Sequence, residues 1–98
     1  MVVNYKGNKA AASQVVEKIT AAGAHAIAVA GDVGVEADVM RLFDTTISEY
    51  GQIDALVNNA GILEPHMTLQ HMTAERISRV LNTNILGSML CALSLIHI

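Results

Sequence analysis

Two consecutive asparagines after a short apolar run are the first residues in this sequence whose types and spacing suit a ligand site. The run Ile53–Val57 leads into Asn58-Asn59-Ala60-Gly61, as a buried strand does when its last residues reach a site. The two amides can satisfy backbone groups of neighbouring loops, and the small residues leave main chain open to a flat ligand. A plain polar turn is the alternative interpretation.

Two other apolar runs are also followed by polar residues. Asn4, Tyr5 and Lys6 come after the first run, and Asp32 with Val33 comes after the second. Ordinary strand-to-helix turns would account for all five, and Asp32 could simply cap a helix. A ligand that spans several strand ends would account for them together.

The elements that must position these residues follow from the apolar spacing. Strands are predicted at Met1–Tyr5, Ala26–Ala30 and Ile53–Asn59. Helical spacing predicts helices from Lys9 to about Ala22, from Val39 to Tyr50, and from an N-cap at Thr73 onward. Gly23 and Gly51 supply helix stops. Asn84 lies in the last helix beside an apolar stripe, where it is either functional or a solvated face residue.

This order of strand, helix, strand, helix, strand, helix predicts an α/β fold with a parallel, doubly wound sheet. Parallel strands need right-handed crossovers, and ligands of such sheets gather at the carboxyl ends of the strands. The polar residues named above lie at those carboxyl ends. The sequence therefore predicts one ligand site assembled from segments far apart in the chain.

The composition limits the classes of function. With 98 residues, 52% of them hydrophobic and 15% charged, the chain can form one small core and is too apolar for a disordered segment. A net charge of -3 argues against nucleic acid and anionic membranes as partners. The single cysteine cannot form an internal disulfide, which favours the cytoplasm. The four histidines share no ligand spacing with Cys91, so no metal site is predicted.

At this point the sequence resembles the short-chain dehydrogenase/reductase family, from Val2 to about Ala92. The motifs that carry the resemblance are Asn58 to Gly61 with the lead-in from Gly51, the Asp32-Val33 pair, and Thr83-Asn84 with Gly87. The resemblance implies part of a Rossmann-type sheet, namely strands two to four of the family with their helices. It implies a hydride transfer between a nicotinamide cofactor and a carbonyl or alcohol substrate, in a homo-oligomer such as a homotetramer.

The resemblance also implies roles for individual residues. Asn84 is the catalytic residue, which helps hold water in a proton relay. Asp32 and Val33 border the adenine ring, and Asn59, Ala60 and Gly61 border the cofactor's ribose side. Asn4, Tyr5 and Lys6 end the strand that selects between NAD and NADP. No acidic residue stands there to accept from a bare ribose, and Lys6 can meet a 2′-phosphate, so NADP is the preferred cofactor and NAD the alternative.

Three features of the family pattern are not found in these residues. The glycine-rich turn that cradles the pyrophosphate is missing, and neither Tyr5 nor Tyr50 has a lysine four residues on, as the family's acid/base pair requires. The first strand of the 3-2-1-4 order is missing too, which would leave apolar sheet edges uncovered. We therefore expect residues 1–92 to form an incomplete NAD(P)-binding domain that is inactive alone.

The last six residues, 93–98, depart from the family pattern. They match one reading frame of a common transposase sequencing adaptor, so the hypothesis is that this tail is read-through and carries no function. Two other classes of function stay open for the chain. It could be a small non-catalytic α/β binding module, or an assembly module that acts through the Asn84 helix.

Overall fold

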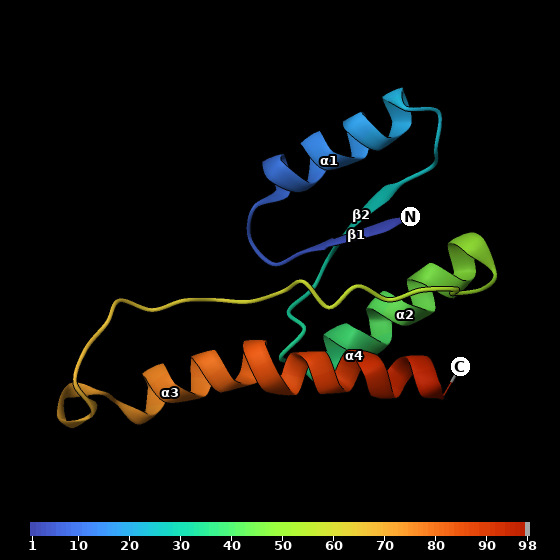
Figure 1. The fold of residues 1–98 in the computed structure, drawn as a ribbon. Helices are drawn as coiled ribbons and strands as arrows, with labels where there is room; N and C mark the ends of the chain where they lie inside the picture. Colours follow the sequence, from blue (N-terminus) through green and yellow to red (C-terminus); the bar gives the residue numbers. More distant parts are fainter. Residues whose placement is uncertain (98) are drawn as a thin grey trace.

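The computed structural model describes residues 1–97 of the chain (Figure 1). Its elements alternate as predicted through the first two strands. They are β1 (Val2–Tyr5), α1 (Lys9–Ala21), β2 (Ile27–Ala30), α2 (Glu36–Tyr50), the 3₁₀ turn η1 (Leu69–His71), α3 (Ala74–Leu81), the π-helix η2 (Asn82–Leu86) and α4 (Gly87–Ile96). The chain is an α/β protein, a partial Rossmann-type arrangement.

The sheet has two parallel strands, β1 and β2, in the register Val2↔Ile27 to Tyr5↔Ala30. Because the strands are parallel, their carboxyl ends lie at the same edge, beside Lys6 and Gly31. Figure 1 shows α1 on one face of the sheet and α2 with α4 on the other. The strands are therefore placed between two helical layers, which explains their apolar residues on both faces.

Local sequence signals fix the helix ends. The side chain of Asn8 caps α1 by accepting from the Ala11 N–H at 3.0 Å, and Thr73 caps α3 by accepting from the Arg76 N–H at 3.2 Å. Gly51 ends α2 with a φ of 80°, and Gly23 follows α1 with a φ of 90°. Both backbone conformations favour glycine. The predicted Thr73 cap and both glycine stops are confirmed.

The core is small and lies between α2 and α4. Val39, Phe43 and Cys91 are its buried members, and the partly buried side chains packed on them are Val33, Ile53, Leu56, Leu90 and Leu95. The radius of gyration is 15.2 Å, whereas a compact domain of this length has about 13 Å. The chain is thus less compact than a closed domain, because it is elongated, with extents of 50 × 30 × 17 Å.

The third predicted strand differs from the expectation. Residues 52–68 form a coil, and within residues 1–97 the segment Ile53–Asn59 makes no ladder with β1 or β2. Ile53 and Leu56 still pack on the core, whereas Val57 is 80% exposed. The reason is that a strand needs a neighbour for its backbone groups, and a cleft separates this segment from β1.

The last three helical elements form one continuous run, Ala74–Ile96, below the coil in Figure 1. By length and composition alone this run of 23 residues could cross a membrane. Soluble proteins have such helices too, and Glu75, Arg76 and Arg79 here form ion pairs. Of the predicted tail 93–98, residues up to Ile96 continue α4, and Ile98 lies outside the described residues. The origin of these six residues stays a prediction.

Cys91 offers a probe of this core. Its thiol is buried, and burial raises its pKa, so little reactive thiolate forms at neutral pH. We expect iodoacetamide to alkylate the native chain on the order of a hundredfold more slowly than the urea-unfolded chain, because reaction requires opening of the core. Mass spectrometry of timed samples measures both rates, and equal rates would show that α4 does not pack on α2.

Candidate functional site

The carboxyl ends of β1 and β2 are joined by side chains at the sheet edge. The amide Nδ2 of Asn4 donates to the carbonyls of Val29 and Gly31, both at 3.1 Å. Lys6 Nζ lies 3.2 Å from Asp32 Oδ2, and the lysine side chain is 66% exposed. Three residues predicted for the cofactor are thus brought together, although the Asn4 amide is already occupied by the turn after β2.

Asp32 organises the turn between β2 and α2. Its Oδ1 accepts from the Gly34 N–H at 2.9 Å, and its own N–H donates to Asp38 Oδ2 at 2.9 Å. The N-cap residue of α2 is Val35, which makes no side-chain capping bond. The alternative that Asp32 caps a helix is therefore wrong. Its carboxylate closes a local turn and turns its second oxygen toward Lys6.

Asp38 extends this network along α2. Arg41 pairs with Asp38 at 3.1 Å and donates to the Ala30 carbonyl at 2.9 Å. The backbone N–H of Asp32 first, and then Arg41, hold the pKa of the Asp38 carboxyl below its ordinary value. The two charged side chains therefore fasten the start of α2 to the end of β2.

The lowered pKa of Asp38 predicts that the free energy of unfolding depends on pH. A carboxyl whose folded pKa is depressed stabilises the fold above its unfolded pKa, about 4, and this contribution is lost as pH falls through the folded pKa. In urea titrations from pH 6 to pH 2, Asp38→Asn should flatten the acid decline of unfolding free energy. Asp44→Asn, an exposed carboxylate of the same helix, serves as control. A decline unchanged by Asp38→Asn would contradict the network.

Asn84 holds the coil that follows the paired asparagines. Its Oδ1 accepts from the Ile62 N–H at 2.8 Å, and its Nδ2 donates to the Ile62 carbonyl at 2.9 Å. The amide thus pairs with both backbone groups of one residue, as a neighbouring strand would. Asn84 is half-buried, so the alternative of a solvated face residue is wrong. It lies next to Gly61, where a Cβ would be 3.6 Å from Asn84 Oδ1.

A second contact ties the Asn58–Gly61 segment to the same helix. Asn58 Nδ2 donates to the Ser88 carbonyl at 3.4 Å, one turn beyond Asn84. Asn59, Ala60 and Gly61 lie between the two tethers and are exposed. The segment is thereby held with its small residues exposed, and its role toward a ligand stays a prediction.

Two glycines let the turn after β2 approach the Asn84 helix. A Cβ on Gly34 would lie 3.0 Å from the Asn82 carbonyl oxygen, and one on Gly87 would lie 2.6 Å from Val33 Cγ2. Val33 and Gly34 therefore pack against η2 and the start of α4. The sequence signalled Gly87 only through its place after Asn84, and the contact of Gly34 with Asn82 was not predicted.

Two hollows lie beside the coil of residues 52–68. A cleft of about 730 Å³ lies between β1 and the coil, and the predicted site residues Asn4, Val33, Asn59 and Ala60 are among its lining. A smaller hollow of about 340 Å³ lies between the coil and α3 and includes Asn84. Tyr5, at the end of β1, lines neither of these two hollows.

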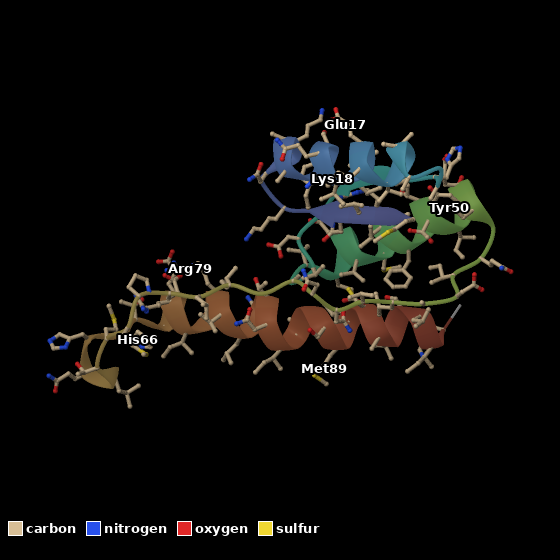
Figure 2. The ribbon with its side chains drawn as sticks, turned by 45° about the horizontal axis from the view of Figure 1, so that its top comes forward. Glu17, Lys18, Tyr50, His66, Arg79 and Met89 are labelled. Atoms are coloured by element: carbon tan, nitrogen blue, oxygen red, sulfur yellow. The ribbon has the colours of Figure 1, made fainter. Side chains whose placement is uncertain are left out.

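The smaller hollow contains residues that sequence reasoning did not select. Ile62 lines it, and Glu64 closes one side by pairing with Arg79 at 2.9 Å. Arg76 also donates to the Pro65 carbonyl. Figure 2 shows Arg79 directed toward the coil and His66 at the far end of the same assembly. Only the position of Ile62 directly after Gly61 could have signalled this role. Among residues 1–97, no group of three His, Cys, Asp or Glu side chains could hold a metal ion.

Comparisons with known proteins identify a family model and relatives that match this chain. The model of the short chain dehydrogenase family matches residues 1–98. The chain is 45% identical over 92 residues to the "Uncharacterized oxidoreductase YgfF" of Escherichia coli, covering 93% of this chain and 37% of that protein. It is 41% identical over 91 residues to the "3-oxoacyl-[acyl-carrier-protein] reductase" of Synechocystis, covering 93% of this chain and 36% of that protein.

A solved structure agrees with these relatives. A short chain dehydrogenase from Burkholderia cenocepacia in complex with NADP superposes with a TM-score of 0.91 at 29% identity, over 98% of this chain and 39% of that one. The chain thus spans between a third and two fifths of the length of these proteins. Sequence motifs, fold and comparisons agree that the chain belongs to the short chain dehydrogenase family.

Proposed function

We propose that these residues form part of a cytoplasmic NAD(P)-dependent oxidoreductase that transfers a hydride between a nicotinamide cofactor and a carbonyl or alcohol substrate. The observation that carries the proposal is the two-bond clamp of Asn84 on Ile62, because it fixes the open Asn59–Gly61 segment beside the helix. A mere polar turn would not require an amide in the middle of a helix. The substrate is the carbonyl or alcohol of a small molecule.

The residues fit a nicotinamide cofactor at the strand ends. Val33 offers an apolar surface, Lys6 an exposed cation, and Asn59 to Gly61 an open backbone. When bound, the cofactor would supply the hydride. Asp32 and Asn4 hold the two turns that border it, and Tyr5 ends β1 beside them. Asn84 positions the coil and, as the catalytic residue, would help hold the water of a proton relay.

NADP is the proposed cofactor, and NAD is the alternative. An exposed lysine at the end of β1 can pair with a 2′-phosphate, and its partner Asp32 would have to release it or share it. The Burkholderia relative was solved with NADP, which supports a nicotinamide dinucleotide of this kind.

A chimera tests the proposed function. Residues 1–92 replace the matching segment of the Synechocystis 3-oxoacyl-[acyl-carrier-protein] reductase, which supplies the remaining length. We expect NADPH-dependent reduction of a 3-oxoacyl substrate by the chimera and none by the 98-residue chain alone, which lacks an acid/base pair in its sequence. A folded chimera without activity, or an active 98-residue chain, would overturn the proposal.

Lys6 gives a direct test of cofactor choice. In the chimera, Lys6→Ala should raise KM for NADPH about tenfold, the loss of roughly one exposed charge-assisted contact, and leave KM for NADH nearly unchanged. Lys18→Ala, in the last turn of α1, is the matched control. Equal changes for both cofactors would mean that Lys6 supports the fold through Asp32 instead of binding a phosphate.

A stripe of exposed apolar side chains along the helical run Ala74–Ile96 favours self-association of the complete protein. Ile77, Leu81, Ile85, Met89 and Ile96 are each between 40% and 75% exposed along one helical run. Figure 2 shows Met89 on the side of α4 away from α2. Helix faces of this kind pack between subunits, so the complete protein is proposed to be a homo-oligomer, such as a tetramer. Neither a nucleic acid nor a membrane is proposed as a partner.

A further inference from the structure

The coil of residues 52–68 is fastened along the helical run Ala74–Ile96 by contacts that follow one another in reverse order. As the coil advances, its partners move back along the helix. From first to last, these contacts are Asn58 with Ser88, Ile62 with Asn84, Glu64 with Arg79, and Pro65 with Arg76. Figure 1 shows the coil lying along the helical run in this way. The coil and the helix are therefore antiparallel neighbours.

The contacts on the two sides of Leu63 differ in kind. Before it, the Asn84 amide makes two neutral hydrogen bonds to Ile62, at 2.8 and 2.9 Å. After it, Glu64 Oε1 accepts from Arg79 Nε at 2.9 Å, and Glu64 Oε2 lies 4.0 Å from Arg76 Nη1. Salt screens ion pairs and acts much less on neutral hydrogen bonds. Only the second group of contacts should therefore weaken as ionic strength rises.

Glu64 is the carboxylate that the two arginines share. Its side chain is 23% exposed and that of Arg76 is 14% exposed, so the pair is better shielded from solvent than an ordinary surface ion pair. Arg76 also donates to the carbonyl of Pro65. Proline in the next position restricts the Glu64 backbone to extended conformations, which limits how the coil can rearrange. Glu64 thus joins a stiff part of the coil to α3.

We propose that Glu64 is a positioning residue, whose ion pairs with Arg76 and Arg79 keep the clamp of Asn84 on Ile62 closed. Ile62 is only two positions from Glu64, so a chain fixed at Glu64 leaves Ile62 little room to move. Release of Glu64 frees the coil and lets the clamp open. Closure of the clamp then depends on ionic strength. The catalytic part of Asn84 rests on the proposed function, whereas the coupling of Glu64 to the clamp does not.

Amide exchange of Ile62 tests this coupling, because that N–H donates to Asn84. NMR of the 98-residue chain measures the rate in 0.01 M and 1 M salt, between which the screening length falls from about 30 Å to about 3 Å. Exchange should be about fivefold faster in 1 M salt. Glu64→Gln should show that faster rate already in 0.01 M salt, with no further effect of salt. The Gly31 amide, bonded to the Tyr5 carbonyl, is the reference for folding and for the direct effect of salt on exchange.

Glu75→Gln is the matched control for the loss of a charge. Glu75 pairs with the same Arg79 at 3.3 Å, but it is 83% exposed and belongs to α3 itself. The variant removes an ion pair from that arginine without releasing the coil, so Ile62 should exchange at the rate of the unchanged chain. Equal acceleration by Glu64→Gln and Glu75→Gln would mean that these charges only stabilise α3, and would overturn the proposal. An Ile62 rate that does not respond to salt would overturn it too.

Kinetics of the chimera separate positioning from cofactor binding. Glu64→Gln should lower kcat about twofold in 0.01 M salt, because a smaller fraction of molecules has the clamp closed. KM for NADPH should stay nearly unchanged, since Lys6 and Asp32 at the strand ends are not moved. An unchanged kcat despite faster Ile62 exchange would contradict the positioning role. An inactive parent chimera would count against the proposed function alone, because the exchange measurement needs no activity.

Discussion

Replacing Asn84 by alanine should reduce kcat of the chimera about a hundredfold, the largest effect expected for any single substitution here. The alanine removes both hydrogen bonds to Ile62 and leaves that residue's N–H and carbonyl without their partner. Displacing a positioned segment by about 1 Å is enough for a loss of this size. Steady-state kinetics with NADPH and a 3-oxoacyl substrate measures the change.

Two further variants separate a catalytic role from a structural one. Asn84→Asp keeps an acceptor for the Ile62 N–H and loses the donor, so its kcat should fall between those of Asn84→Ala and the unchanged chimera. Asn82→Ala, an exposed residue of the same π-helix, should leave kcat nearly unchanged. A role confined to folding would lower thermal stability in Asn84→Ala while kcat per folded molecule stayed the same. That result would contradict the proposed role.

Adding bulk at Gly87 should produce the largest loss of stability. A Cβ there would lie 2.6 Å from Val33 Cγ2 and 3.1 Å from the Val33 carbonyl oxygen, so side chain and backbone must both yield. Overpacking of this kind costs about 1–3 kcal/mol, which exceeds the gain of about 1 kcal/mol from replacing a helical glycine by alanine. Gly87→Ala should therefore lose up to about 2 kcal/mol in urea unfolding, and Gly87→Val more.

A double-mutant cycle tests the cause of this loss. Val33→Ala removes the Cγ2 atom that the new Cβ would meet, so Gly87→Ala should cost less in the Val33→Ala background than in the unchanged chain. The analogous pair of Gly23→Ala with Val33→Ala should be additive, because nothing lies within 4 Å of a Cβ at Gly23. Additivity at Gly87 would mean that this close approach does not limit packing.

Local sequence signals predicted most of the helices and two of the strands. Thr73 and Gly51 act within a few residues of themselves, and α1 and α2 each have an apolar stripe, so their positions needed no knowledge of distant contacts. The strand predicted at Ile53–Asn59 did not form a ladder. Its apolar run was interpreted correctly as facing a core, but pairing depends on a neighbouring strand, which a local pattern does not contain.

The candidate site, like the fold, could be predicted from the sequence only in part. The Asn58–Gly61 motif and Asn84 were selected from the sequence, and the structure places them together through Ile62 and Ser88. Their detailed partners could not be predicted, because a backbone group has no signature in the sequence. The ion pair of Lys6 with Asp32 also joins two strand ends 26 positions apart, and only the parallel pairing of β1 with β2 brings them into contact.

The π-helix η2 changes how the long helical run meets its surroundings. Its turn holds one residue more than an α-helical turn, and one residue corresponds to a rotation of about 100°. The extra residue therefore shifts by one position the sequence spacing between the α3 residues that face the coil at Glu64 and Pro65 and the α4 residues that face α2. Deleting one residue within Asn82–Leu86 should therefore restore a regular helix and leave Cys91 facing the core. The irregular turn thus accommodates one extra residue inside a continuous helical run, and Asn84 lies within that turn.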